Sequence, residues 1–148
     1  MPEVIEFYSV TDEYGWCSNF APFPIQVRGE RWPTTEHFFQ AQKFEDAESR
    51  EEIRRAKSPM LAARMGRERT RKLRRDWESV KVAVMREALR AKFQQHEDLA
   101  RQLLATGEAK LVEHTGNDDY WGDGGDGRGQ NMLGRLLMEI RAELRRPG

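Results

Sequence analysis

The strongest constraint on the fold is a long helical pattern of apolar side chains between residues 76 and 95. Apolar residues recur there at intervals of three and four, which places them on one broad face of an α-helix. Asp76 precedes the pattern, and aspartate is a common helix N-cap. The face comprises Trp77, Val80, Val84, Met85, Ala88, Leu89, Ala91 and Phe93. Because other elements must cover so wide a face, we expect this segment to be the central core helix.

Shorter segments predict further helices and a small amount of sheet. Helical spacing and capping residues indicate helices over residues 34–44, 47–56, 59 onward, 97–105 and 131–145. β-Prone residues indicate short strands over residues 4–8, 25–27 and 110–114. We expect the first thirty residues to form a small sheet or hairpin. The predicted fold class is mainly α with a minor β part.

Length and composition narrow the class of protein. A chain of 148 residues fits one domain, expected to span residues 1–148. The net charge is zero, which argues against bulk attraction to nucleic acid or anionic lipid. No apolar run reaches membrane-spanning length and the N-terminus lacks signal-peptide features, so we expect a cytoplasmic protein. The single cysteine, Cys17, excludes an intramolecular disulfide.

The segment 117–131 combines carboxylates, two aromatic side chains and a run of glycines just before the last predicted helix. Tyr120 and Trp121 can stack on a flat ring. The amides of Gly127 and Gly129, leading into that helix, are expected to hold a phosphate. A flexible surface loop is the alternative. Trp121 argues against it, because a solvated linker gains nothing from an exposed indole.

Two side chains of the helix predicted at 34–44 carry candidate chemistry. Glu36 lies in the first turn and is a candidate general base; the alternative is a favourable interaction with the helix dipole. Lys43 lies about two turns later, hence on the same face, where it can bind a phosphate. The alternative for Lys43 is an ordinary solvated lysine.

Other kinds of site have little support. No motif for a thiol or serine nucleophile, a P-loop or a dinucleotide-binding unit is present. A basic stretch at 64–75 balances an acidic run at 45–52, which favours a salt-bridged surface over a phosphate or nucleic-acid contact. We expect no metal, because none of the three histidines has a companion at ligand spacing: His37, His96 and His114.

Several segments together, in chain order, resemble the YbiA/NADAR family. The three longest are WPTTEHFFQAQKF at 32–44, DYWGDG at 119–124 and GQNMLG at 129–134. Shorter matches are CSNF at 17–20, Pro24-Ile25, Asp76-Trp77, Val80-Lys81, Met85, Lys92-Phe93 and LLATG at 103–107. The resemblance covers nearly the whole chain and points to the bacterial branch of riboflavin-pathway N-glycosidases.

The resemblance implies a mostly helical, single-domain N-glycosidase, a hydrolase that needs no cofactor. Members of this branch are associated with cleaving the ribosyl C1′–N bond of phosphoribosyl-amine pyrimidine intermediates of riboflavin biosynthesis. This releases ribose 5-phosphate and removes reactive metabolites. Other branches remove ADP-ribose from modified guanine. The expected partner is therefore a small phosphoribosyl or ADP-ribosyl substrate, with no membrane role.

Carried onto this chain, the resemblance implies a site of carboxylates, aromatic rings and hydrogen-bonding groups. The expected catalytic residues are Glu36, Asp119 and Asp123. The expected substrate-binding residues are Ser18, Asn19, Trp32, Lys43, Trp77, Tyr120, Trp121, Gly122 and Asn131. Two alternatives stay open: an ADP-ribosyl glycosidase acting on modified guanine or nucleic acid, and a non-catalytic module that binds ADP-ribose or a nucleotide. Neutral net charge argues against a polynucleotide substrate.

Overall fold

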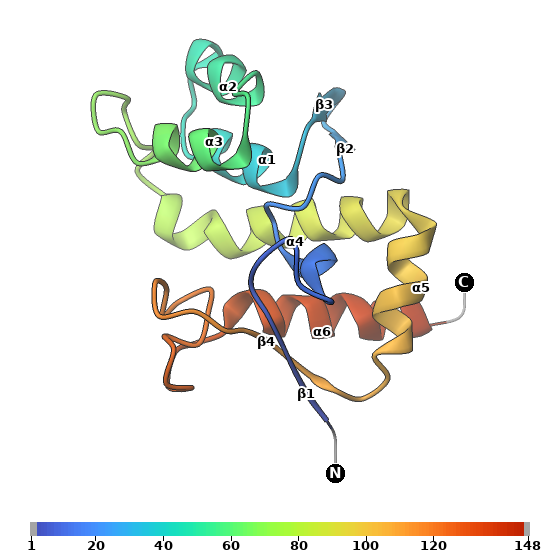
Figure 1. Ribbon diagram of the computed structural model, residues 1–148. Helices are drawn as coiled ribbons and strands as arrows, with labels where there is room; N and C mark the ends of the chain where they lie inside the picture. Colours follow the sequence, from blue (N-terminus) through green and yellow to red (C-terminus); the bar gives the residue numbers. More distant parts are fainter. Residues whose placement is uncertain (1–2, 147–148) are drawn as a thin grey trace. The chain divides into compact units, whose positions relative to one another are not determined.

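The computed structural model describes residues 3–146, in which the chain forms two compact units. The terminal unit comprises Met1–Ala21 with His96–Gly148, and the middle unit comprises Pro22–Gln95. In Figure 1 the middle unit runs from blue to yellow, and the terminal unit holds the dark blue and the orange-to-red segments. The single domain expected from the sequence stays a prediction, and each unit is described by itself.

The middle unit begins with a short hairpin. Strand β2 (Ile25–Val27) pairs antiparallel with β3 (Glu30–Trp32), and Ile25 lies opposite Trp32. The two residues between the strands, Arg28 and Gly29, both have positive φ angles of 54° and 81°. This is the turn geometry that matches the twist of a two-residue hairpin.

Four helices follow in the middle unit: α1 (Thr35–Ala41), α2 (Ala47–Arg54), α3 (Pro59–Gly66) and α4 (Trp77–Gln95). The side chains of Thr34, Asp46 and Ser58 cap the first three, each accepting a hydrogen bond from the amide three residues on. The sequence therefore fixes where these helices begin.

The centre of this unit is α1 rather than α4. Every residue of α1 is buried, and α1 packs against α2, α3 and α4. Helix α4 has the expected buried face, but Val80 is only half-buried. Asp76 does not cap α4 with its carboxylate, which is bound by Arg74. A short, wholly buried helix gives no amphipathic pattern, so periodicity pointed to α4 instead.

The terminal unit joins segments from both ends of the chain. Strand β1 (Val4–Phe7) pairs parallel with β4 (Lys110–Glu113), which lie side by side in Figure 1. The short 3-10 helix η1 (Gly15–Cys17) follows β1. Helices α5 (Glu97–Ala105) and α6 (Met132–Arg145) pack together, and α6 also packs on β4.

The strand prediction for the first thirty residues was partly wrong. The strands form where expected, but β1 pairs with β4 and not with β2. Parallel strands need a crossover, and here the whole middle unit lies between them in the sequence. The mainly α fold class is confirmed. Among residues 3–146, no helix combines the length and apolarity that crossing a membrane requires.

Candidate functional site

Glu36 lies in the first turn of α1 and is held by its own helix. Only 8% of its surface is exposed, and Gln40 Nε2 donates a hydrogen bond to Glu36 Oε2 at 2.7 Å. The two residues are one helical turn apart, so their side chains meet on one face. A general base or an electrostatic stabiliser needs a carboxylate in a fixed orientation, and this hydrogen bond provides it.

Gln40 in turn depends on a glycine of α3. Gln40 is buried, and among the described residues its Oε1 has no hydrogen-bond partner. A Cβ atom at Gly66 would lie 1.9 Å from that Oε1, so a larger residue there would force the amide to move. Sequence reasoning named neither residue. The glycine in a helix was the available signal, because such glycines commonly mark close packing.

Lys43 follows α1 and lies half-buried above an aromatic ring. Its Nζ is 6.0 Å from the centroid of the Trp77 ring and 3.5 Å from the carbonyl oxygen of Gly66. Burial lowers the pKa of Lys43 to about 8; Glu36 opposes this shift, while Arg69 and Arg67 add to it. Lys43 is therefore not an ordinary solvated lysine, and the middle unit brings it together with Glu36 and Trp77.

The tryptophans of the middle unit are mostly buried. Trp77 is 5% exposed and packs edge-on against Phe39, with ring centroids 5.1 Å apart. Trp32 is 3% exposed, packs edge-on against Phe38, and donates its indole N–H to Val27 O. A ring buried and bonded in this way is a core residue, so its burial does not support the stacking role expected for Trp32.

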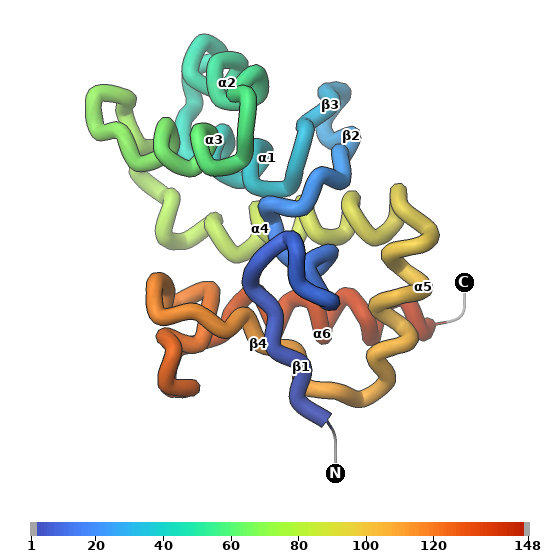
Figure 2. The backbone as a smooth tube through the Cα atoms, in the orientation of Figure 1, coloured from blue at the N-terminus to red at the C-terminus, as the bar shows by residue number. Residues whose placement is uncertain are grey.

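In the terminal unit, a segment of eighteen residues without helix or strand connects β4 to α6, and Figure 2 follows its path in orange. Asp118 Oδ1 accepts hydrogen bonds from the amides of Tyr120 and Trp121. Their rings are half-buried and meet edge-on, with centroids 5.0 Å apart. Their carbonyls accept the amides of Met132 and Leu133 at the start of α6. The segment is thus an ordered structure rather than a flexible linker.

The phosphate site expected at the amides of Gly127 and Gly129 was wrong at Gly129; for Gly127 it stays a prediction. The amide of Gly129 donates to Asp123 O at 2.8 Å, and the first amides of α6 bind the aromatic carbonyls. A Cβ atom at Gly129 would lie 2.6 Å from the main chain of Asp123. The glycine therefore permits two backbone segments to pack closely, and its amide is not available to an anion.

The two expected catalytic aspartates, Asp119 and Asp123, lie in very different surroundings. Asp123 is 5% exposed, and its carboxylate accepts hydrogen bonds from the amides of Thr115 and Gly125 and from His114 Nδ1. Burial by itself would raise the pKa of Asp123, but these hydrogen bonds outweigh it and hold the pKa below its usual value. Asp119 is exposed, and its main-chain oxygen accepts the amide of Gln130. The carboxylate of Asp119 is the more accessible of the two.

The remaining expected binding residues of the terminal unit are engaged within the protein. Asn131 Oδ1 accepts the amide of Glu113 and its Nδ2 donates to Leu111 O, which ties the start of α6 to β4. Ser18 Oγ accepts the amide of Phe20, and Asn19 is 8% exposed. At Gly122, a Cβ atom would lie 2.8 Å from the side chain of Thr115. These hydrogen bonds and close contacts give the residues a role in stabilising the fold. Their roles in binding substrate stay predictions.

His114 has companions that the sequence analysis missed. Its Nδ1 lies 2.7 Å from Asp123 Oδ2 and 3.6 Å from Glu6 Oε2, and ligand atoms of the three side chains all lie within 4.8 Å of one another. The hydrogen bond to Asp123, with the two negative charges, raises the pKa of His114. Glu6 and His114 are far apart in sequence, so spacing gave no signal; the pairing of β1 with β4 brings them together.

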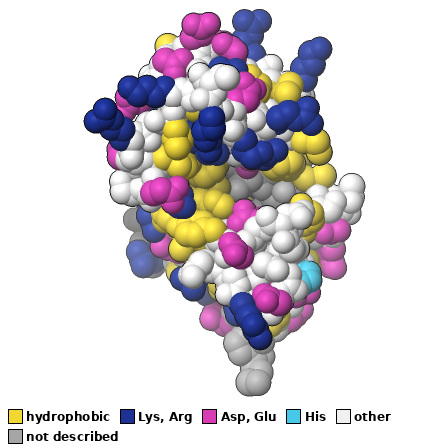
Figure 3. All heavy atoms as spheres, turned by 90° about the vertical axis from the view of Figure 1, so that its left-hand side faces the viewer, with side chains coloured by type: hydrophobic (Ala, Val, Ile, Leu, Met, Phe, Trp, Pro, Cys, Tyr) yellow, Lys and Arg dark blue, Asp and Glu magenta, His cyan; other side chains and the backbone are white. Residues whose placement is uncertain are grey.

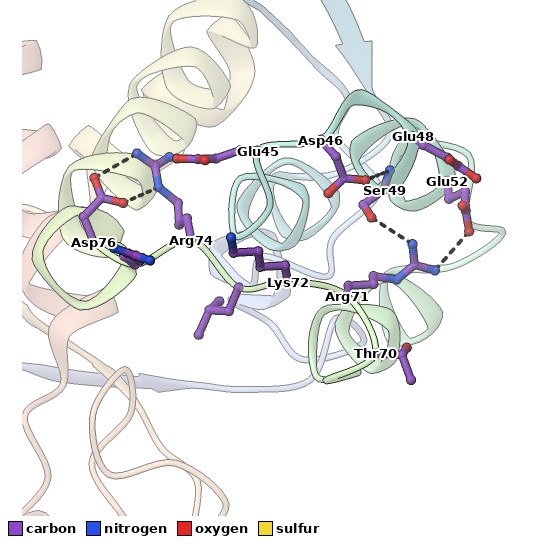
Figure 4. A pocket seen from close by; sticks show the side chains of 12 residues that line it. Glu45, Asp46, Glu48, Ser49, Glu52, Thr70, Arg71, Lys72, Arg74 and Asp76 are labelled. Carbon is purple, nitrogen blue, oxygen red and sulfur yellow. Dashed lines mark hydrogen bonds and ion pairs between the residues drawn. The ribbon is translucent and has the colours of Figure 1, made fainter.

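Part of the basic stretch forms the salt-bridged surface that was expected. Arg71 pairs with Glu52, and Arg74 pairs with Asp76. These pairs line a cavity of about 860 Å³ between α2 and the segment after α3, shown in Figure 4. In Figure 3 basic and acidic side chains are interspersed over the upper part of the molecule, where α2 and α3 lie. The charges of these four side chains are thus balanced locally.

Comparison with known proteins identifies the family and agrees with the fold. The family model described as "NADAR domain" matches residues 6–145. The chain is 65% identical to "N-glycosidase YbiA" of Escherichia coli over 95% of its own length and 88% of that protein. It is 46% identical to "N-glycosidase Npun_R5314" of Nostoc punctiforme, over 95% of this chain and 92% of that protein.

Two further comparisons concern pathway and structure. The chain is 47% identical to "Riboflavin biosynthesis protein VVA0006" of Vibrio vulnificus, over 97% of this chain but 39% of that protein. The NMR structure of YbiA from E. coli matches with a TM-score of 0.90 and 64% sequence identity, covering 97% of this chain and 86% of that one.

Proposed function

The chain belongs to the NADAR family, and from that premise we propose that it is an N-glycosidase acting on phosphoribosyl-amine pyrimidine intermediates of riboflavin biosynthesis. It would hydrolyse the ribosyl C1′–N bond and release ribose 5-phosphate. Relatives named as N-glycosidases support the reaction, and the relative named as a riboflavin biosynthesis protein supports the substrate. The single structural observation that carries the proposal is the buried Glu36 carboxylate, fixed by Gln40 and close enough to Lys43 to act on its charge.

The proposed reaction adds water across the C1′–N bond. As the bond breaks, positive charge develops at C1′, and a fixed carboxylate stabilises such an oxocarbenium-like centre. Glu36 is assigned this role and that of accepting a proton from the attacking water. The departing amine takes up a proton from a second acid. Asp119 is the candidate for this acid, because its side chain is accessible to a ligand; it would act in its protonated form.

The other residues would bind the substrate or support the site. Lys43 would bind the phosphate, and Trp121 and Tyr120 offer half-buried ring surface for stacking on the base or ribose. Asp123 was expected to be catalytic; its three hydrogen-bond donors favour a positioning role, in which it holds the segment that carries Asp119. Absence of a cofactor and a cytoplasmic location remain predictions.

Purified protein incubated with each of the two phosphoribosyl-amine intermediates tests the proposal. Release of ribose 5-phosphate is expected from the wild type, and Glu36→Gln should lower kcat at least about 100-fold while the protein stays folded. Glu48→Gln is the matched control, since Glu48 is an exposed first-turn glutamate of α2.

Parallel incubation with ADP-ribosylated guanosine separates the alternatives. Release of ADP-ribose, with no release of ribose 5-phosphate, would replace the proposed substrate by that of the other branch. If neither product forms but ADP-ribose binds, the protein is a binding module and the proposed activity is wrong.

A further inference from the structure

Two cationic side chains converge on one carbonyl oxygen in the middle unit. The oxygen belongs to Gly66, the last residue of α3; Lys43 Nζ lies 3.5 Å from it and Arg69 Nη1 lies 3.3 Å from it. Two nitrogens this close to one atom are also close enough to each other to bind oxygens of a single phosphate group. Arg67 follows Gly66 directly and is the C-cap residue of α3.

Arg67 and Arg69 differ from two other arginines of the basic stretch, Arg71 and Arg74, which pair with carboxylates. Within residues 3–146, neither Arg67 nor Arg69 forms an ion pair, and both side chains are exposed. Their positive charges are therefore not balanced by a direct partner, whereas those of Arg71 and Arg74 are.

Charges of both signs act on Lys43. Burial is the largest cause of its lowered pKa; Glu36 and Glu78 oppose the shift, and Arg69 and Arg67 add to it. A cation near the C-terminus of a helix often binds its last carbonyl groups, and this would explain one of the two contacts to Gly66 O. It does not explain why Lys43 and Arg69 converge on the same oxygen with Arg67 next to it in the chain, an arrangement of positive charge that a bound dianion would stabilise.

We propose that Lys43, Arg67 and Arg69 form the subsite for the phosphate ester of the substrate, with the Gly66 carbonyl as the acceptor that holds two of them in place until the phosphate binds. A guanidinium supplies paired, directional donors and the lysine supplies a point charge, a combination suited to a phosphate monoester. The assignment rests on the proposed function, because it takes the substrate to be a phosphoribosyl compound. It adds two arginines that the family resemblance did not single out.

Binding of ribose 5-phosphate, compared with ribose, tests the subsite without any turnover. Calorimetry or NMR titration should show wild-type protein binding ribose 5-phosphate and binding ribose much more weakly. The double variant Arg67→Gln/Arg69→Gln should lose at least about tenfold in affinity for ribose 5-phosphate. Arg64→Gln, at an exposed position in the last turn of α3, is the matched control and should bind as the wild type does.

Steady-state kinetics give a second, independent measurement. In the double variant, KM for the phosphorylated substrate should rise about tenfold or more with kcat nearly unchanged, because the phosphate is remote from the bond that breaks. Unchanged affinity and KM in a variant that is folded by circular dichroism would overturn the subsite, even if the enzyme is an N-glycosidase. Loss of ribose 5-phosphate binding in the variant, with no glycosidase activity in the wild type, would instead support the subsite and overturn the proposed function.

Discussion

Gln40 donates a 2.7 Å hydrogen bond to the carboxylate of Glu36, and the opposite side of its amide lies against Gly66. Two helices therefore fix the orientation of the Glu36 carboxylate. Helix α1 carries both the carboxylate and its hydrogen-bond donor, Gln40, and α3 leaves space for the Gln40 side chain at Gly66. Positioning of this kind is what a catalytic carboxylate needs, because small displacements cost large factors in rate.

Replacement of Gln40 by Leu should lower kcat about 10- to 100-fold, since the charged carboxylate loses a hydrogen bond of about 1.5–3 kcal/mol. KM should change much less, because Gln40 is expected to orient Glu36 and not to bind substrate. Turnover of the proposed substrate measures both. Gln94→Leu, on α4, is the control; a Gln40→Leu enzyme with normal kcat would show that Glu36 needs no such support.

Replacement of Gly66 by Ala should reproduce the loss of activity and destabilise the protein by about 1–3 kcal/mol, because the added methyl meets Gln40 Oε1. Helix propensity alone would predict the opposite, a gain of about 0.5–1 kcal/mol. Thermal and denaturant unfolding decide between them. At Gly116 a Cβ atom meets nothing within 4 Å, so Gly116→Ala should leave stability and turnover unchanged.

The two expected catalytic aspartates, Asp119 and Asp123, should differ in their effects on stability and turnover when each is changed to Asn. Asp123→Asn should cost about 1–3 kcal/mol in the free energy of unfolding, because a buried, three-fold hydrogen-bonded carboxylate is altered. Asp119→Asn should leave stability within about 0.5 kcal/mol and lower kcat. Asp126→Asn, at an exposed position, is the control for both. An Asp119→Asn enzyme with full activity would exclude Asp119 as the acid.

His114 should titrate above its ordinary pKa of 6.5, because Asp123 and Glu6 favour its protonated form. A raised histidine pKa stabilises the fold below pH 6.5, and this contribution is lost as pH rises through the folded value. The lowered pKa of Asp123 has the opposite pH dependence. It stabilises the fold above pH 3.8, and this stabilisation is lost as pH falls through the pKa of the folded state. The pair should therefore support the fold most between about pH 4 and 6.5. NMR titration of the His114 ring, in wild type and Asp123→Asn, measures this; equal pKa values in the two proteins would contradict it.

Lys43 should titrate near pH 8 and not near 10.5. Because the folded state then binds fewer protons than the unfolded state between pH 8 and 10.5, stability should rise with pH in that range relative to Lys43→Gln. The charge on the proposed phosphate subsite falls over the same range, so KM should rise above about pH 8. Lys43→Arg keeps its charge and should remove this alkaline rise in KM. Heteronuclear NMR of the lysine side chains follows the titration directly.

Local features of the sequence determined where most of the helices begin and end. The caps Thr34, Asp46 and Ser58 and the stop near Gly107 are set by residues within one turn of each helix end, so they can be found without knowing the rest of the fold. Glu36, Lys43 and Trp121 were singled out for the same reason: the chemistry of each residue type and its place in a motif are properties of the chain itself.

The tertiary structure decided which groups work together. The sequence spacing of Gln40 and Gly66, or of Glu6 and His114, says nothing about contact, since packing of α1 on α3 and pairing of β1 with β4 create it. The same holds for the amide of Gly129, which looked available to a phosphate until the main chain of Asp123 was found to accept it. A residue's type and its neighbours along the chain fix what it can do. Burial and hydrogen-bond partners, which depend on distant parts of the chain, decide what it is left free to do.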